Sequence, residues 1–203
     1  FSRAFAELVA DGGQPAVAAL SRASSALARG ELMQRADAWS DEVTRERYLE
    51  RCELKTARLF EAACRLGASL GAPGPAAAGD LAGFGRRIGV AFQIFDDVLD
   101  VSGPAERTGK HRGTDLLDGT VTLPLILARE RDPALRSLDL RGVRTPAQAE
   151  AVCDAIVATG VLDEARDTAL SIVADAKADL PVLPETQQGA LELVADGVVD
   201  RYA

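Results

Sequence analysis

An apolar segment, GVAFQIFDDVLDVSG (residues 89–103), contains three aspartates in its middle. A carboxylate that leaves water without a partner costs several kcal/mol, so something positive is expected beside them. In a helix, at about 100° per residue, four polar side chains fall on one stripe: Asp96, Asp97, Asp100 and Gln93. Oxygen-only ligation of this kind suits a hard cation, and we predict Mg²⁺, with Mn²⁺ as a second possibility.

The same stripe carries Gly85 and Gly89, one to three turns earlier. A glycine costs about 1 kcal/mol in a helix interior, so its repetition here indicates close packing or a ligand. A solvated acidic patch is the alternative interpretation of the aspartates. The apolar flanks and the glycines favour the metal site over that patch.

A lysine lies within the apolar face of another helical segment, ELKTARLFEAACRLGA (residues 53–68). Lys55 falls about 40° from Leu59 and about 60° from Cys52 on a helical projection. A lysine in this position must extend its amine to solvent or meet an anion. Both alternatives stay open on this segment alone.

A third segment, ERTGKHRGTDLLDG (residues 106–119), gathers basic side chains beside glycines in an acidic protein. The basic residues are Arg107, Lys110, His111 and Arg112. Such a loop can hold phosphate oxygens, although a solvated linker would look the same. A cation site, a lysine on a core face and a basic glycine loop together fit one ligand, a diphosphate bridged by metal.

Composition excludes several other classes of protein. The chain has 203 residues, a formal net charge of −8 and a single histidine. The charge argues against nucleic acid or an anionic membrane as the main partner, and one histidine leaves little for zinc sites or Ser-His triads. Apolar runs are too short for a transmembrane segment. An odd cysteine count and no leader pattern predict free thiols in a cytoplasmic protein: Cys52, Cys64 and Cys153.

Helix formers dominate the chain, and no clean alternation of apolar and polar residues indicates a strand. The breaks coincide with glycine and proline clusters, such as DGGQP and GAPGP. We therefore predict one all-α domain over residues 1–203. The expected helices cover about 1–11, 14–36, 42–70, 76–102, 119–131, 146–159, 161–180 and 185–202.

These motifs resemble those of the trans-polyprenyl diphosphate synthases. GVAFQIFDDVLDVSG is similar to their second aspartate-rich motif, and LKTA to their Lys-Thr element. TGKHRGTDLLDGTVTLPLILA resembles the segment that follows, and ARGELMQ (residues 28–34) resembles a variant found in longer-chain members. The order of the motifs matches along the whole chain. The resemblance implies an isoprenoid-synthase-type helical bundle, and a homodimer as in typical members.

By this resemblance the protein condenses an allylic prenyl diphosphate with isopentenyl diphosphate to make a longer trans-polyprenyl diphosphate. Metal and basic groups would stabilise the departing diphosphate, because its high negative charge needs cations around it. Three roles are implied for residues of this chain. Metal binding falls to Asp96 and Asp97, with Asp100 as a third or supporting acid. Binding of the allylic diphosphate falls to Lys55 and Lys110. The site of the allylic cation would be lined by Thr56 and Gln93.

The chain also departs from the family pattern. No DDxxD or longer variant occurs before residue 89, and the basic residues that hold isopentenyl diphosphate are missing. The chain opens with FSRAFAELVA, which resembles the region just after the first aspartate-rich motif. We therefore expect the C-terminal two-thirds of a synthase, apparently without its N-terminal helices. Thr120 stands where the family usually has lysine, and His111 where proline is common.

Three functions remain possible at this point. The first is part of an active synthase, although these 203 residues alone are expected to be inactive. The second is a non-catalytic or regulatory subunit of a heteromeric prenyl synthase, which the missing motif and lysine would suit. The third is a helical scaffold whose acids merely hold a cation. The combination of Lys55, Thr56, Gln93, Asp96 and Asp97 counts against the scaffold.

Overall fold

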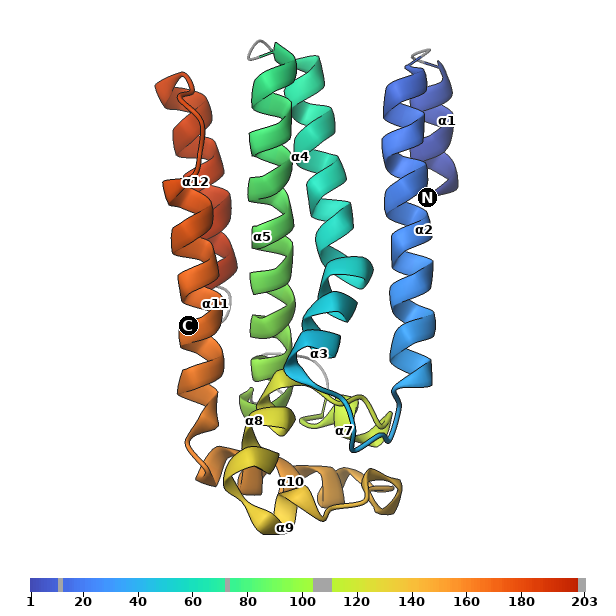
Figure 1. Cartoon of the computed structure of the whole chain (residues 1–203), viewed down its shortest axis with the longest axis vertical. Helices are drawn as coiled ribbons and strands as arrows, with labels where there is room; N and C mark the ends of the chain where they lie inside the picture. Colours follow the sequence, from blue (N-terminus) through green and yellow to red (C-terminus); the bar gives the residue numbers. More distant parts are fainter. Residues whose placement is uncertain (11–12, 72–73, 104–110, 201–203) are drawn as a thin grey trace.

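The computed structural model describes residues 1–10, 13–71, 74–103 and 111–200, and all regular structure within them is helical (Figure 1). The prediction of an all-α fold is confirmed. The long helices are α1 (Ser2–Ala10), α2 (Gln14–Ala36), α3 (Arg45–Cys52), α4 (Arg58–Leu70), α5 (Gly74–Ser102), α8 (Leu123–Arg131), α10 (Pro146–Ala158), α11 (Val161–Ala178) and α12 (Glu185–Asp200). Four shorter elements join them: the π-helix η1 (Glu53–Ala57), α7 (Thr114–Leu117), α9 (Pro133–Arg136) and the 3₁₀-helix η2 (Leu140–Gly142).

Helix α5 lies at the centre of the bundle and packs most extensively against α4 and α11. In Figure 1, α1 and α2 stand on one side of α4 and α5, and α11 and α12 stand on the other. Helix α10 crosses one end of the bundle. Every residue of α8 from Leu123 to Arg129 is buried, as expected for a helix whose apolar residues cover its whole circumference. None of the described helices is long and apolar enough to cross a membrane.

Local sequence explains where several helices begin. The Thr44 hydroxyl accepts a hydrogen bond from the Arg47 amide at 3.2 Å and caps α3. Thr145 and Gln148 form a capping box at α10, with proline in the first turn. Gly160, at φ +72°, makes the turn between α10 and α11 in a conformation that other residues rarely adopt.

Two of the predicted helices are wrong in detail. The continuous helix expected over 42–70 is divided by the π-helix into α3, η1 and α4, which run on from one another. The helix expected from residue 119 begins only at Leu123, because Gly119 has φ +70° and Thr122 is extended. The elements α7, α9 and η2 were not predicted, because three or four residues are too few to show a periodic pattern.

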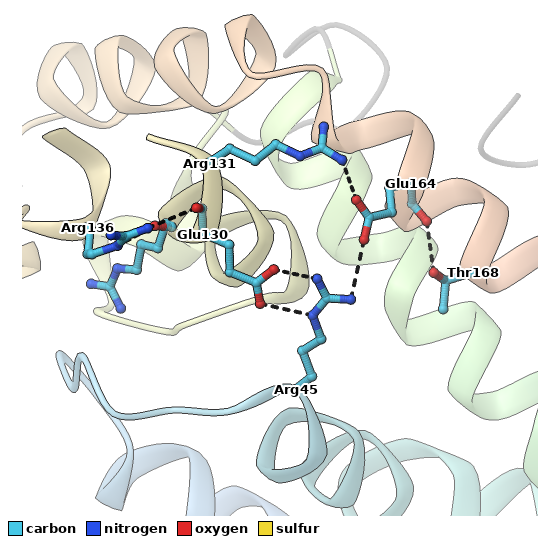
Figure 2. A network of polar contacts seen from close by, with 7 residues as sticks. Arg45, Glu130, Arg131, Arg136, Glu164 and Thr168 are labelled. Atoms are coloured by element: carbon cyan, nitrogen blue, oxygen red, sulfur yellow. Dashed lines mark hydrogen bonds and ion pairs between the residues drawn. The ribbon is translucent and has the colours of Figure 1, made fainter. Parts of the chain in front are cut away.

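An ion-pair network ties the start of α3 to α8 and α11 (Figure 2). Arg45 binds Glu130 through two hydrogen bonds of 3.1 and 2.6 Å, and reaches Glu164 at 3.3 Å. Arg131 contacts the same Glu164 at 2.5 Å. The side chains are partly exposed, so each pair contributes about 1 kcal/mol or less. The network links the start of α3 to both of these helices.

The three cysteines are free thiols, as predicted. Cys52 and Cys153 are buried, and Cys64 is half-buried beside α5. Burial raises the pKa of all three thiols, that of Cys153 to about 11. The thiols are therefore protonated in the folded chain at neutral pH.

Candidate functional site

A pocket of about 220 Å³ lies where α2, α3, η1, α5, α7 and the segment after α7 meet. It brings together four of the residues that the sequence predicted, Lys55, Gln93, Asp96 and Asp97. The remaining lining residues were not predicted as site residues: Gln34, Tyr48, Arg51, Cys52, Asp115 and Thr120.

The π-helix and a glycine place Lys55 in this pocket. A Cβ atom at Gly30 would lie 2.5 Å from the Lys55 amide nitrogen, so α2 approaches η1 closely there. Gln34, one turn further along α2, then accepts a hydrogen bond from the Lys55 amine at 2.9 Å. Glu31 lies 3.2 Å from the same amine. Of the two sequence alternatives for Lys55, the structure favours a lysine that meets an anion, since only 29% of its side chain is exposed.

Asp97 is the most buried carboxylate of the pocket, at 4% exposure. The Tyr48 hydroxyl donates to one of its oxygens at 2.6 Å, and the Gln93 amide donates to the other at 2.8 Å. Thr56 donates in turn to the Gln93 carbonyl oxygen at 2.8 Å. Thr56 does not line the pocket itself, but its hydrogen bond fixes the orientation of Gln93.

The acids of the pocket carry more negative charge than its cations neutralise. Burial raises the pKa of Asp97 to about 6, with a further contribution from Asp96, against the lowering effects of Tyr48, Gln93 and Arg51. The pKa of Asp115 is raised well above its usual range, first by burial and then by the charges of Asp97 and Asp100. A bound divalent cation would relieve this repulsion.

The donor set fits Mg²⁺ only if another ligand completes its coordination. Among the described residues, no group of three or more His, Cys, Asp or Glu side chains is arranged to hold a metal ion. The pocket nevertheless offers the carboxylates of Asp96, Asp97 and Asp115. Mg²⁺ is usually held by one or two carboxylates together with substrate phosphates and water. The arrangement therefore suits a cation shared between the protein and a phosphate-containing ligand.

Asp100 lies outside the lining of the pocket. Its carboxylate accepts hydrogen bonds from the amides of Thr114 and Asp115 at 3.1 and 3.2 Å. These bonds hold α7 against the end of α5 and thereby position Asp115. The role of Asp100 as a third metal ligand stays a prediction.

The predicted basic loop is described only in part. Lys110 and Arg107 lie outside the described residues. His111 is exposed. Arg112 donates to the Val101 carbonyl and to Asp154, both at 2.9 Å, so its guanidinium anchors the loop to α5 and α10.

The glycine stripe of α5 serves close helix packing. A Cβ atom at Gly85 would lie 2.5 Å from the Phe60 carbonyl oxygen, and one at Gly89 would lie 2.6 Å from the Ala57 Cα. Only glycine permits this approach of α5 to η1 and α4. The approach brings Thr56 within hydrogen-bond distance of Gln93.

Some of the residues that sequence reasoning missed carried a usable signal. Tyr48, Cys52 and Lys55 are spaced by four and three residues, which places them on one helical face. Asp115 stands in the quoted basic loop, but nothing in that loop indicated burial. Arg51 gave no signal, because one arginine in a helix is normally a solvated side chain.

Comparisons with known proteins agree with this fold. The family model described as polyprenyl synthetase matches residues 1–159. The geranylgeranyl diphosphate synthase of Methanosarcina mazei is 35% identical over 161 residues, which cover 79% of this chain and 49% of that protein. Heptaprenyl diphosphate synthase component 2 of Geobacillus stearothermophilus is 36% identical over 173 residues, which cover 84% and 53%. The chain thus spans about half the length of these curated relatives.

A solved structure extends the agreement to three dimensions. The polyprenyl synthase from Caulobacter crescentus CB15, complexed with calcium and isoprenyl diphosphate, superposes with a TM-score of 0.91 at 35% identity. The superposition covers 100% of this chain and 64% of that one. Because the family match covers most of the sequence and the helical fold is shared throughout, this chain belongs to the polyprenyl synthetase family.

Proposed function

We propose that the pocket binds the diphosphate group of an allylic prenyl diphosphate together with Mg²⁺. One observation carries the proposal: acids and cations of four different elements, α3, η1, α5 and α7, converge on the same small pocket. The acids alone would repel a diphosphate, and the cations alone would not hold a metal. A ligand that consists of both a divalent cation and a diphosphate satisfies both sets of side chains.

Each residue has a definite task in this proposal. Asp96 and Asp97 hold the cation, with Asp115 and Asp100 nearby as further acids. Lys55 donates to a phosphate oxygen when it exchanges its contacts with Gln34 and Glu31 for the ligand. The bound metal supplies positive charge that stabilises the departing diphosphate. Lys110 is proposed as a second diphosphate-binding lysine on the basis of the sequence alone.

Thr56 and Gln93 are proposed to face the allylic carbon from which the diphosphate departs. The hydrogen bonds from Thr56 to Gln93 and from Gln93 to Asp97 hold the amide in one orientation. A fixed dipole beside a developing carbocation requires no reorganisation during the reaction. The whole protein would then condense the allylic diphosphate with isopentenyl diphosphate, as the names of the synthases it resembles indicate.

A second candidate is a subunit of a heteromeric synthase. The observation that favours it is the 36% identity to a protein named as component 2 of a heptaprenyl diphosphate synthase. Thr120 in place of the usual lysine suits a subunit with a weakened site. The two candidates differ in whether the diphosphate site is complete without another protein.

We further propose a homodimer that works in the cytoplasm. Large apolar side chains are exposed on the outer helices, among them Val9, Leu32, Leu193 and Val194. Exposed apolar surface of this kind often marks a protein interface, and a two-fold dimer is its commonest solution. Free cysteines are typical of the cytoplasm.

Binding of geranyl diphosphate to the purified chain tests the proposed site. With Mg²⁺ present, calorimetry should show saturable binding that is lost when EDTA removes the metal. Asp96→Asn should weaken binding at least tenfold, whereas Asp80→Asn, an exposed acid on the same helix, should leave it unchanged. Binding that ignores both EDTA and Asp96→Asn would contradict the proposal.

A further inference from the structure

Arg51 is the most buried charged side chain of the described residues, at 3% exposure. It lies on α3, four residues before Lys55, and lines the candidate pocket together with that lysine. Its Nη2 donates to the Val121 carbonyl oxygen, and its guanidinium carbon lies 5.5 Å from the centre of the Tyr48 ring. These two contacts hold the planar group in one position.

The other terminal nitrogen of the guanidinium, Nη1, is not engaged by any residue that the structure describes. Nη1 is buried and makes no hydrogen bond to any described residue. The charge of Arg51 lowers the pKa of Asp97, which lines the same pocket, but no ion pair joins Arg51 to a described carboxylate. A buried donor is normally satisfied, so an orphaned one beside a pocket indicates a missing ligand.

We propose that Arg51 is a diphosphate-binding residue of this chain, with Nη1 donating to a phosphate oxygen in the pocket. The inference rests on the proposed function of the pocket and extends it to a residue on α3. A guanidinium stays protonated in proteins and presents its N–H groups in a plane that matches phosphate oxygens. With Nη2 engaged by Val121, Nη1 is the terminal nitrogen that remains to bind the ligand.

The neighbouring residue at position 120 strengthens the inference. Thr120 lines the pocket as a neutral side chain, and its hydroxyl accepts a hydrogen bond from Gln34 at 3.4 Å. Val121, which Arg51 binds, is the next residue along the chain. The guanidinium is therefore a fixed cation on the side of the pocket where position 120 contributes none. Together with Lys55 it places two cations around the ligand.

The test compares two buried arginines by calorimetric titration with inorganic diphosphate in the presence of Mg²⁺. Arg51→Met should weaken binding by roughly 10- to 100-fold, because it removes a charged hydrogen-bond donor but keeps an apolar stem. Arg129→Met is the control, since Arg129 is also buried with an unpartnered Nε. Among the described residues its guanidinium donates to the Ser40 and Leu138 carbonyls, which do not line the pocket. It should leave the affinity unchanged.

A second measurement uses the unmodified side chain. In chain labelled with ¹⁵N-arginine, the Arg51 Nε–H signal should shift when Mg²⁺ and diphosphate are added, while the Arg129 signal should not. Arg51→Lys identifies the signal by its loss. Affinity within twofold of the parent in Arg51→Met, or an unmoved Arg51 signal in a chain that binds diphosphate, overturns the inference alone. A parent chain that binds no diphosphate overturns the proposed function and this inference with it.

Discussion

Replacement of Gly89 by alanine tests how the central helix is held against the site. An alanine Cβ there would lie 2.6 Å from the Ala57 Cα and 3.2 Å from the Cβ atoms of Ala57 and Phe60. Carbon atoms in good contact are about 3.5–4.0 Å apart, so α5 and η1 must separate by about 1 Å. Extra atoms forced into a packed core cost typically about 1–3 kcal/mol of stability.

A matched control lies on the same helix. Gly83 is exposed, and a Cβ atom there meets nothing within 4 Å. Both substitutions gain about 1 kcal/mol from the higher helix propensity of alanine, so the difference between them isolates the packing cost. Gly83→Ala should raise the free energy of unfolding by about 1 kcal/mol, and Gly89→Ala should fall about 1–3 kcal/mol below Gly83→Ala.

Urea unfolding followed by circular dichroism measures both variants. Separation of α5 from η1 should also lengthen the 2.8 Å hydrogen bond between Thr56 and Gln93. Gly89→Ala should therefore bind diphosphate more weakly even where it stays folded, while Gly83→Ala should not. Equal stability of the two variants would refute the close approach of α5 to η1.

Three further predictions concern the thiols, the activity of a chain that spans about half the length of its curated relatives, and the exposed helices. Because burial raises the pKa of Cys153 to about 11, its labelling by a thiol reagent should be slow at neutral pH and should accelerate as the pH rises toward that value. Rapid labelling of Cys153 in the native chain at neutral pH would contradict this. Incubated with allylic and isopentenyl diphosphates and Mg²⁺, the 203 residues alone should form no longer product, and robust elongation would show that one acidic motif suffices. In sedimentation equilibrium over a dilution series the chain should behave as a dimer, and a monomer at tens of micromolar would contradict the proposed interface.

Helical periodicity was enough to predict the fold and to bring together four residues of the candidate pocket. Gln93, Asp96 and Asp97 lie on consecutive turns of one regular helix, so a constant angle per residue places them correctly. Lys55 was placed on the right face, although the π-helix that contains it shifts the phase of every residue after it. No pattern in the residues Glu53–Ala57 marks that shift. Close contacts from distant segments accompany it, of Gly30 with Lys55 and of Gly89 with Ala57.

The rest of the pocket depends on contacts between distant segments. Asp100 shares the helical stripe, but its carboxylate accepts hydrogen bonds from the first amides of α7. Asp115 enters the pocket because α7 lies against the end of α5, which a helical projection of α5 does not describe. Arg51 is buried by the Val121 carbonyl, 70 residues further along the chain. Such pairings follow from the packing of the bundle rather than from local sequence.

Calorimetric titration of Mg²⁺ with and without inorganic diphosphate tests the central claim most directly. The described residues provide no three-residue metal cluster, so the account predicts weak Mg²⁺ binding to the chain alone and clear, saturable binding once diphosphate is present. Asp96→Ala should abolish the diphosphate-dependent binding. Equal Mg²⁺ binding in the two titrations, or unchanged binding in Asp96→Ala, would contradict a site in which protein and diphosphate share the metal.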